Sequence, residues 1–565
     1  MAGEYLKAPT IERLGALLAQ LKDGSIRIPP FQRQFVWSTE QRLQLMDSVN
    51  HGLPCGSLML WRTKRRLPWR SALGPFALPE PPAVEGALYT YLLDGQQRMT
   101  SLFGALGAAL WTQAEQTPLV DTKSTLPNGD PWDLWYDLSE GAFVAVPLEP
   151  DEDDQPTPAL PLRLLLDDQL FDEWRDQASL ERAHKRAARE LQSSFRDYLI
   201  PTVSLVTEDM EAVKRTFLRI NAGGTPMDDV NLARALTWTD EFDLSAALDD
   251  ACAALEPEGW AAVPHELLLK VVAGLSGQEP FAADIEFVAR AIRAGLNTED
   301  ELLTRATAGA RRAAALLRRL DIWGPHALPY GYAFVLLAEG LADGPLPEDR
   351  ELAALGRLLL QMHTERPGQA PPHVLAVLRR ELQGVLKGAS PWPRAKGKTK
   401  PPPRRVTAPG RFNLGWGRSR LAALALVSAK PRGVDGAPLD AGPLLAQGGT
   451  GFVPQLLTPG MADAPPLLRE ALAAGPAKER LRGVGNRVLL PPDQLAELRV
   501  GLFDGSISAA VLESHLINGD ALQKLTIGDV AGFLKAREAA IVEAQRAQLV
   551  RFGVPGDLLT LLKPD

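Results

Sequence analysis

The sequence is poor in cysteine and lacks long apolar runs. Its 565 residues include two cysteines, Cys55 and Cys252, and neither belongs to a CxxC pair or another metal-ligand spacing. We therefore expect reduced structural thiols rather than disulfides or a zinc site. No apolar stretch is long enough to span a bilayer, and the first residues do not resemble a signal peptide. These absences predict a cytoplasmic protein without a membrane partner.

Several well-known enzyme motifs are absent too. The chain has no GxxxxGK(S/T) phosphate-binding loop, no GxSxG elbow and no HExxH pair, so it does not read as a P-loop NTPase. The formal net charge is −8, which excludes a polycation. Contact with nucleic acid therefore requires a local basic surface.

What is present is typical of a soluble globular protein of about three or four domains, with 45% hydrophobic and 23% charged residues. The patterns predict an α+β protein. Residues 1–240 mix strands and helices, residues 241–386 are helical, and residues 411–565 are mixed but mostly helical. Residues 387–410 are basic and rich in proline, and we interpret them as a solvated tether in preference to a nucleic-acid-binding arm.

Local signals place several elements. Thr10 is expected to cap a helix whose apolar stripe includes Ile11 and Leu14, and Ser38 with Gln41 forms a capping box that opens a second helix. Further expected elements are strands over 26–28, 56–62, 88–93 and 201–206, a hairpin over 132–146, and helices over 99–111, 180–198, 208–220, 229–238 and 529–550.

The most informative feature is the run Asp94-Gly-Gln-Gln-Arg98, which stands between an apolar strand and an apolar helix. The first amides of a helix are unpaired and its dipole is positive there, so such a junction can bind an anion. Asp94 and Gln97 alone fit a capping box. Capping explains neither Gln96 nor Arg98, because a cation in the first turn opposes the dipole and favours an anionic partner.

Two further clusters are candidates for phosphate contacts. Gln32 and Arg33 follow a proline pair, and an arginine there can bind a phosphate bidentately, whereas we interpret the aromatic residues around them as core. Arg219 and Asn221 precede Gly223-Gly224, where backbone amides can approach a phosphate closely. A glycine pair between helices is also a common turn, so this third cluster is weak by itself.

Three segments, Ile28–Trp37, Leu93–Arg98 and Phe217–Pro226, together resemble the DGQQR-motif family. This family is the N-terminal module of GmrSD type IV restriction enzymes and of SspE-like phosphorothioate-sensing effectors, and the resemblance extends from about Ile11 to Trp238. It implies a ParB/sulfiredoxin-like fold, NTP (GTP or ATP) as the ligand, Mg²⁺ as a companion ion, and DNA as a partner in antiphage defence. Other defence proteins are further candidate partners.

The resemblance also implies the roles of individual residues. One cleft would be lined by Gln32, Arg33, Asp94, Gln96, Gln97, Arg98 and Asn221. Arg33 and Arg98 would neutralise phosphate charge during catalysis. Asp94 would orient Arg98, position a water molecule or hold Mg²⁺.

Family members often carry a C-terminal HNH-type nuclease domain, and residues 411–565 resemble it only in part. Asn486, within Val484–Leu490, and His515 look like remnants of that domain. The expected upstream Asp-His-Ile-x-Pro is replaced by Gln455–Pro459, which contains no histidine. We therefore expect a degenerate nuclease-like region, and a structural histidine at position 515 is favoured over a catalytic one.

Three functions remain open from the sequence. The favoured hypothesis is a type IV restriction-like defence effector that binds and hydrolyses NTP and engages DNA, including modified DNA. The alternative is a non-catalytic sensor of a nucleotide or of modified DNA that recruits a partner effector. The third is a nuclease whose cleavage centre lies in the DGQQR domain itself.

Overall fold

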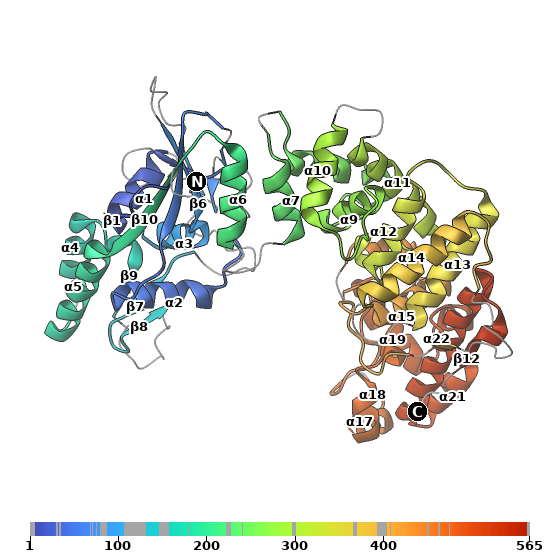
Figure 1. Ribbon diagram of the computed structural model, residues 1–565. Coiled ribbons are helices and arrows are strands. Elements are labelled where there is room, and N and C mark those ends of the chain that lie inside the picture. The colour runs from blue at the N-terminus through green and yellow to red at the C-terminus, as the bar shows by residue number, and fades with distance from the viewer. Residues whose placement is uncertain are drawn as a thin grey trace. The chain divides into compact units, whose positions relative to one another are not determined.

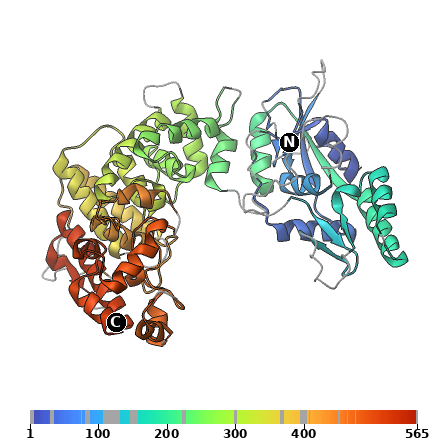
Figure 2. The same ribbon diagram turned by 180° about the vertical axis from the view of Figure 1, so that it is seen from behind.

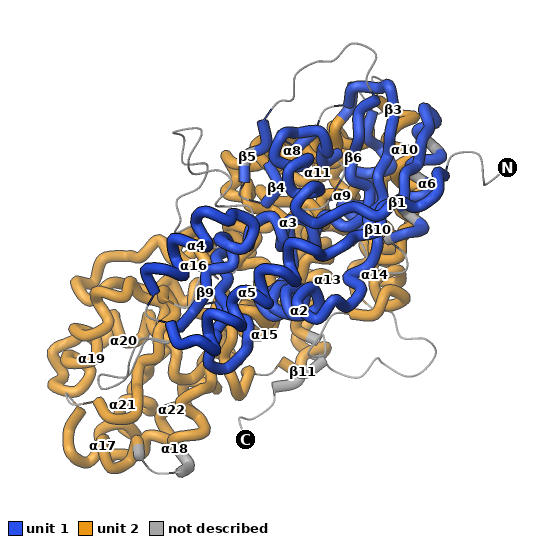
Figure 3. The backbone as a smooth tube through the Cα atoms, turned by 90° about the vertical axis from the view of Figure 1, so that its left-hand side faces the viewer, with its two compact units in different colours: residues 1–242 blue, residues 243–565 orange. Residues whose placement is uncertain are grey.

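The computed structural model describes two compact units, residues 1–242 and residues 243–565 (Figure 3). The described residues are 6–561 without 30–31, 33–34, 68, 71, 75, 80–87, 107–131, 146–157, 179, 222–227, 240, 297–300, 365–369, 393–403, 407, 449–450, 462–463 and 474.

A five-stranded mixed sheet forms the centre of the first unit. Its strands, in spatial order, are β1 (Thr10–Arg13), β10 (Leu199–Val206), β3 (Leu58–Thr63), β6 (Tyr89–Asp94) and β2 (Ile26–Arg27). β10 runs parallel to β3, and β6 runs antiparallel to β3 and parallel to β2. Because β6 runs opposite to β3 and β10, its C-terminal end lies beside their N-terminal ends.

Alternate residues of β3 and β6 point to two separate cores, as the period of a strand requires. Leu60 and Leu92 belong to the larger core, which also receives residues of α1 (Leu14–Lys22), α2 (Thr39–Asn50), α3 (Gln96–Leu106) and α5 (Arg182–Asp197). Trp61 and Leu93 point to the other face, where they pack in a second core with residues of α6 (Met210–Asn221) and with Ala235 of α7 (Asp229–Thr237). α6 lies along this face of the sheet (Figure 1).

Smaller elements extend this unit on the side of the larger core. β7 (Trp135–Asp137) pairs with both β8 (Ala142–Val144) and β9 (Ala159–Pro161). β4 (Ala72–Leu73) and β5 (Phe76–Ala77) form a short hairpin. α4 (Asp168–Gln177) follows the turn Leu162–Leu164 and lies beside α5 in both views (Figures 1 and 2).

The second unit is largely helical. Its first helices are α8 (Leu244–Ala253), α9 (His265–Leu275), α10 (Ile285–Gly295), α11 (Leu302–Leu317), α12 (Gly331–Gly340), α13 (Glu348–Thr364) and α14 (Pro372–Leu386). The later ones are α15 (Gly417–Ser428), α16 (Ala441–Ala446), α17 (Pro466–Ala473), α18 (Gly475–Arg480), α19 (Leu495–Asp504), α20 (Ala509–Ser514), α21 (Gly519–Thr526) and α22 (Val530–Arg551). β11 (Arg404–Val406) pairs in parallel with β12 (Leu559–Leu561). Across the described part of the chain, the model contains no helix with the length and apolarity needed to cross a membrane.

The α+β expectation is confirmed, with the sheet in the amino-terminal unit and helices in the remainder. The finer division into 241–386, 387–410 and 411–565 stays a prediction. The Ser38–Gln41 capping box is present at the start of α2.

The helix expected to begin at Thr10 is wrong in its first turn. Residues 10–13 form the edge strand β1, which pairs antiparallel with β10, and α1 begins at Leu14. The Thr10 hydroxyl lies 2.7 Å from that of Thr202, so pairing across 192 residues replaces the local cap. Tertiary pairing outweighs the helix signal here.

A pair of substitutions, one at a buried and one at an exposed position, tests where α1 begins. Leu14 is fully buried in α1, whereas Ile11 is 66% exposed on β1. We expect Leu14→Ala to cost about 2–5 kcal/mol of folding free energy, and Ile11→Ala to cost about 0.5 kcal/mol or less. Calorimetric melting of the full-length chain measures both. Equal destabilisation would mean that Ile11 belongs to a buried helical stripe and that the strand is wrong.

Candidate functional site

The first two motifs meet at the C-terminal end of β6. The Gln32 side chain is 5% exposed and its Nε2 donates to the carbonyl oxygens of Leu92 and Leu93, at 2.9 and 2.7 Å. The Gln97 Oε1 accepts from the backbone N–H of Val36 at 2.8 Å. Residues about 60 positions apart in the sequence are therefore parts of one site. Arg33 lies outside the described residues.

Two side chains of the DGQQR segment make defined contacts at the start of α3. The helix begins at Gln96, after Gly95 in the left-handed region with φ of 98°. The Asp94 carboxylate accepts from Arg98 Nη2 at 3.0 Å, and the Gln97 side-chain oxygen binds Val36. The Asp94–Arg98 pair is thus internal to the junction, whereas the Gln97 oxygen joins the segment at Val36 to the helix. The expected capping box stays a prediction.

Arg98 is the hub of the junction. Its Nη1 donates to the carbonyl oxygen of Cys55 at 2.8 Å, and its Nη2 donates to that of Ser57 at 2.9 Å as well as to Asp94. The Arg98 side chain is 16% exposed. The anion that a cation in the first helical turn requires is therefore supplied by the chain itself, and the arginine fastens the loop at residues 55–57 to α3.

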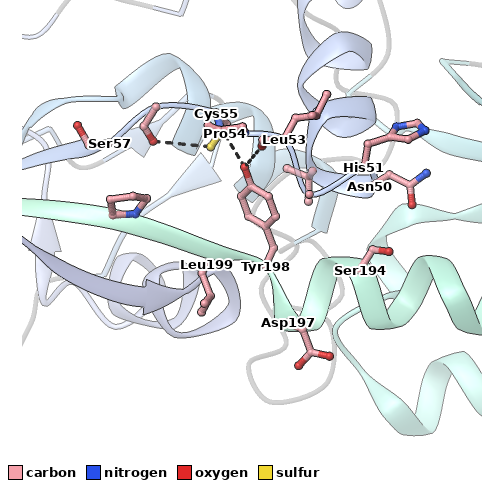
Figure 4. A pocket seen from close by; sticks show the side chains of 14 residues that line it. Asn50, His51, Leu53, Pro54, Cys55, Ser57, Ser194, Asp197, Tyr198 and Leu199 are labelled. Atoms are coloured by element: carbon pink, nitrogen blue, oxygen red, sulfur yellow. Dashed lines mark hydrogen bonds between the residues drawn. The ribbon is translucent and has the colours of Figure 1, made fainter.

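Tyr198 holds the same loop from the other side, as Figure 4 shows. Its hydroxyl donates to the carbonyl oxygen of Leu53 at 2.5 Å and accepts from the N–H of Cys55 at 3.1 Å. Burial, together with the hydrogen bond and charge of the Cys55 thiol, raises the pKa of Tyr198 to about 12. The tyrosine is therefore neutral at physiological pH and remains a hydrogen-bond donor to the loop.

A cavity of about 660 Å³ opens beside this loop, within the size range of small-molecule sites. It is lined by Val49, Asn50, His51, Gly52, Leu53, Pro54, Cys55, Gly56, Ser57, Ser194, Asp197, Tyr198, Leu199 and Pro201. Sequence reasoning named none of these residues as a site. A signal that could have pointed to them is the run Gly52–Ser57, which contains two glycines and a proline between a helix and a strand.

Gln96 has an acceptor without a donor. It is 5% exposed, and its buried Oε1 has no hydrogen-bond partner among the described residues. Leaving a buried carbonyl oxygen without a donor costs about 1–3 kcal/mol. A donor from a ligand or a bound water would remove that cost, so Gln96 is the residue of this junction that is best prepared to accept a hydrogen bond.

The third motif approaches the same strand but is described only in part. α6 lies against β6, and Phe217 packs in one core with Leu93. Arg219 is exposed near the end of this helix. Asn221 is the last residue of α6, and its side chain lies outside the described residues, as do residues 222–227. The structure thus brings the helix of this motif to β6, and the roles of Arg219 and Asn221 stay predictions.

The side chains of both proposed nuclease remnants, Asn486 and His515, form hydrogen bonds with backbone groups. Asn486 is fully buried; its Nδ2 donates to the carbonyls of Leu457 and Leu481, and its Oδ1 accepts from the Leu457 N–H. His515 is 2% exposed, and its Nε2 lies 2.9 Å from the carbonyl oxygen of Arg432. These contacts support the structural interpretation of both residues.

The described residues offer no ready metal centre. Within them, no group of three His, Cys, Asp or Glu side chains could hold a metal ion. The Asp94 carboxylate is already paired with a cation, Arg98, which opposes the binding of a second cation at the same oxygens. Asp94 therefore fits the first role expected of it, the orientation of Arg98, better than that of a metal ligand.

Comparison with known proteins gives one family match, in the amino-terminal unit. A family model described as the GmrSD restriction endonuclease N-terminal domain matches residues 14–238. The match runs from the first residue of α1 to the residue after α7, so it contains all three motifs. No curated protein sequence matches the chain.

Two glycines that line the cavity provide a matched test of whether Arg98 holds the loop at residues 55–57. Gly52 and Gly56 both have positive φ, 64° and 88°. A Cβ at Gly56 would lie 2.6 Å from Arg98 Nη1, whereas one at Gly52 has nothing within 4 Å. Alanine in the left-handed region costs about 1–2 kcal/mol at either position, and we expect Gly56→Ala to cost a further 1–3 kcal/mol or so because Arg98 must move.

Thermal unfolding and amide hydrogen exchange of residues 55–57 measure this difference. Faster exchange in Gly56→Ala than in Gly52→Ala is the expected result. Equal melting temperatures and exchange rates would show that Arg98 does not hold the loop.

Acidification tests the burial of His515. Burial lowers its pKa to about 4, so between pH 6.5 and 4 the unfolded chain binds a proton that the folded chain does not. Its contribution to stability is complete above pH 6.5 and falls as the pH drops, by about 2 kcal/mol at pH 5. We expect His515→Gln to weaken the loss of melting temperature between pH 7 and 5. The exposed His373→Gln serves as the control, and an identical pH profile for His515→Gln and wild type would contradict the assignment.

Proposed function

We propose, from the match of residues 14–238 to the GmrSD restriction endonuclease N-terminal domain, that the protein is a restriction-type antiphage effector whose amino-terminal unit binds and hydrolyses NTP. The family suggests restriction-type defence and DNA as the substrate. Nucleotide hydrolysis and the engagement of DNA by this chain are our proposals, and so is a ParB-like assignment for the mixed sheet.

The observation that carries the proposal is the convergence of two separated motifs at the start of α3. Gln32 and Gln97 join the segments, and the helix start supplies unpaired amides and a positive dipole. Anions of the size and charge of a triphosphate bind at such helix ends. The unpartnered Oε1 of Gln96 can accept from a ribose hydroxyl, a base amino group or the attacking water.

In this proposal Arg98 acts as a positioning residue. Its Nη atoms are occupied by Cys55, Ser57 and Asp94, so its effect on a ligand passes through the loop that lines the cavity. The role of neutralising phosphate charge is then proposed for Arg33, which the sequence analysis groups with the same motif. The Mg²⁺ expected with the nucleotide finds no cluster of ligands among the described residues, and no step is assigned to it.

The alternative, a sensor that binds without turnover and recruits a partner, is favoured by the carboxy-terminal region. Asn486 and His515 are buried and bonded to backbone groups, which leaves neither side chain for the cleavage of DNA. A nuclease partner would then perform the cleavage. The two hypotheses share the nucleotide site and differ in turnover.

Phosphate release from ATP, GTP, CTP and UTP, with and without DNA, separates them. We expect wild type to release phosphate from at least one nucleotide. Gln96→Leu should lower kcat/KM about tenfold or more through the lost hydrogen bond, while its melting temperature stays equal or rises because an unsatisfied buried acceptor is removed.

Gln97→Leu is the control for structural damage, because its oxygen binds the Val36 N–H and its loss should lower the melting temperature. Saturable nucleotide binding without phosphate release would favour the sensor. A wild-type protein that binds none of the four nucleotides would refute the proposal, and an unchanged kcat/KM in Gln96→Leu would remove that residue from the site.

A further inference from the structure

A strongly basic segment lies at the other end of the sheet from Asp94. Residues 62–70 read Arg-Thr-Lys-Arg-Arg-Leu-Pro-Trp-Arg, with five cations and no carboxylate in nine positions. In the register of β3 with β6, Met59 pairs with Asp94 and Thr63 pairs with Tyr89. The segment therefore leaves the sheet where β6 begins, about 15 Å from the DGQQR junction at 3.3–3.4 Å per residue.

The backbone of this segment is anchored at several points. Glu208 accepts from the Thr63 hydroxyl and from the Lys64 N–H, at 2.6 and 2.8 Å. The Leu67 N–H donates to the Tyr91 hydroxyl at 2.8 Å, and the Arg70 N–H donates to the Ile28 carbonyl at 2.9 Å. The loop is thus held in place by the sheet below it.

The anchored loop presents its cations to solvent. Lys64, Arg65 and Arg66 are exposed. Desolvation raises the pKa of the Glu208 carboxyl, but the hydrogen bonds from Lys64 and Thr63, together with the charges of Arg65 and Lys64, outweigh it and lower that pKa. Exposed cations on a preorganised loop lose little conformational freedom on binding a polyanion.

A buried arginine, Arg27, lies beneath the segment. Arg27 is 5% exposed, and its guanidinium lies between the rings of Trp69 and Tyr89, at 4.5 and 4.7 Å from their centroids. Its Nη1 is buried and has no hydrogen-bond partner among the described residues. The Arg66 guanidinium also lies over the Trp69 ring, 5.7 Å from its centroid. Arg27 thus adds a positive charge beneath the loop and packs against its aromatic ring, while its buried Nη1 is out of reach of a ligand at the surface.

We infer that residues 62–67 and 69–70, with Arg27 behind them, form a surface that binds the phosphate backbone of double-stranded DNA. The inference rests on the proposed function for the choice of DNA, and on the charge and the anchoring of the loop for its location. A net charge of −8 repels a polyanion from the chain as a whole, so binding must concentrate on a local basic surface such as this one. Lysine and arginine contacts to phosphates carry no sequence information, so binding here should be insensitive to DNA sequence.

The test compares two variants with the same change in charge. In the first, Lys64, Arg65 and Arg66 become glutamine. In the second, three exposed cations of α5 in the same unit, Arg182, Lys185 and Arg186, become glutamine. Binding of a fluorescein-labelled DNA duplex of about 20 base pairs is followed by anisotropy over a salt series, because each phosphate contact contributes about −0.9 to the slope of log K against log salt.

We expect the 64–66 variant to bind at least about tenfold more weakly at 100 mM salt and its slope to fall in magnitude by about 3, while the α5 variant stays close to wild type. Unchanged melting temperatures confirm that both variants fold. Equal losses in the two variants would mean that total charge alone matters and would overturn the surface.

Two other results also decide the question. A 64–66 variant that binds DNA like wild type would overturn the surface and leave the proposed engagement of DNA intact, whereas a wild-type protein that binds no DNA would remove both. An RNA duplex of the same length that binds as tightly, with the same loss in the 64–66 variant, would overturn the assignment to DNA.

Discussion

The hydrogen bonds of Arg98 are the constraint on which the candidate site depends. A guanidinium in the first turn of a helix opposes the dipole, and it is held there by the Asp94 carboxylate and two carbonyl oxygens of the cavity loop. Removing any of these partners leaves a largely buried cation with unsatisfied donors. The helix start and the loop are therefore coupled in geometry, and Gly56 must remain without a side chain for the arginine to fit.

Local physics made much of the amino-terminal unit predictable. The Ser38–Gln41 capping box involves residues three positions apart, and the junction of β6 with α3 follows from one apolar run, one polar turn and one further apolar run. What the sequence did not reveal depends on partners far along the chain. Thr10 pairs with Thr202, and the carbonyls that bind Arg98 belong to residues more than 40 positions earlier.

The candidate residues divide along the same line. The resemblance grouped Gln32 with the DGQQR segment, and the structure joins them through the carbonyls of β6. It could not show that Gln97 binds backbone while Gln96 retains a buried oxygen without a donor, because this distinction depends on which face of α3 each glutamine occupies. Asn486 and His515 had suitable chemistry for a nuclease, and it is their burial that argues for a structural role.

The two ends of strands β3 and β6 differ in how their cationic side chains are placed. At the Asp94 end, the charge of Arg98 is neutralised by a carboxylate of the protein. A ligand would therefore be recognised there by backbone amides, side-chain carboxamides and the helix dipole. These interactions depend on exact position and fall off within one helical turn. At the Tyr89 end, exposed lysine and arginine side chains form a field that acts over a Debye length and weakens with salt. The first arrangement suits a small ligand held in one orientation, and the second suits a long polyanion held without regard to sequence. Because β3 and β6 run between both ends, the same pair of strands fixes the distance between the nucleotide site and the DNA surface that we assign to this unit.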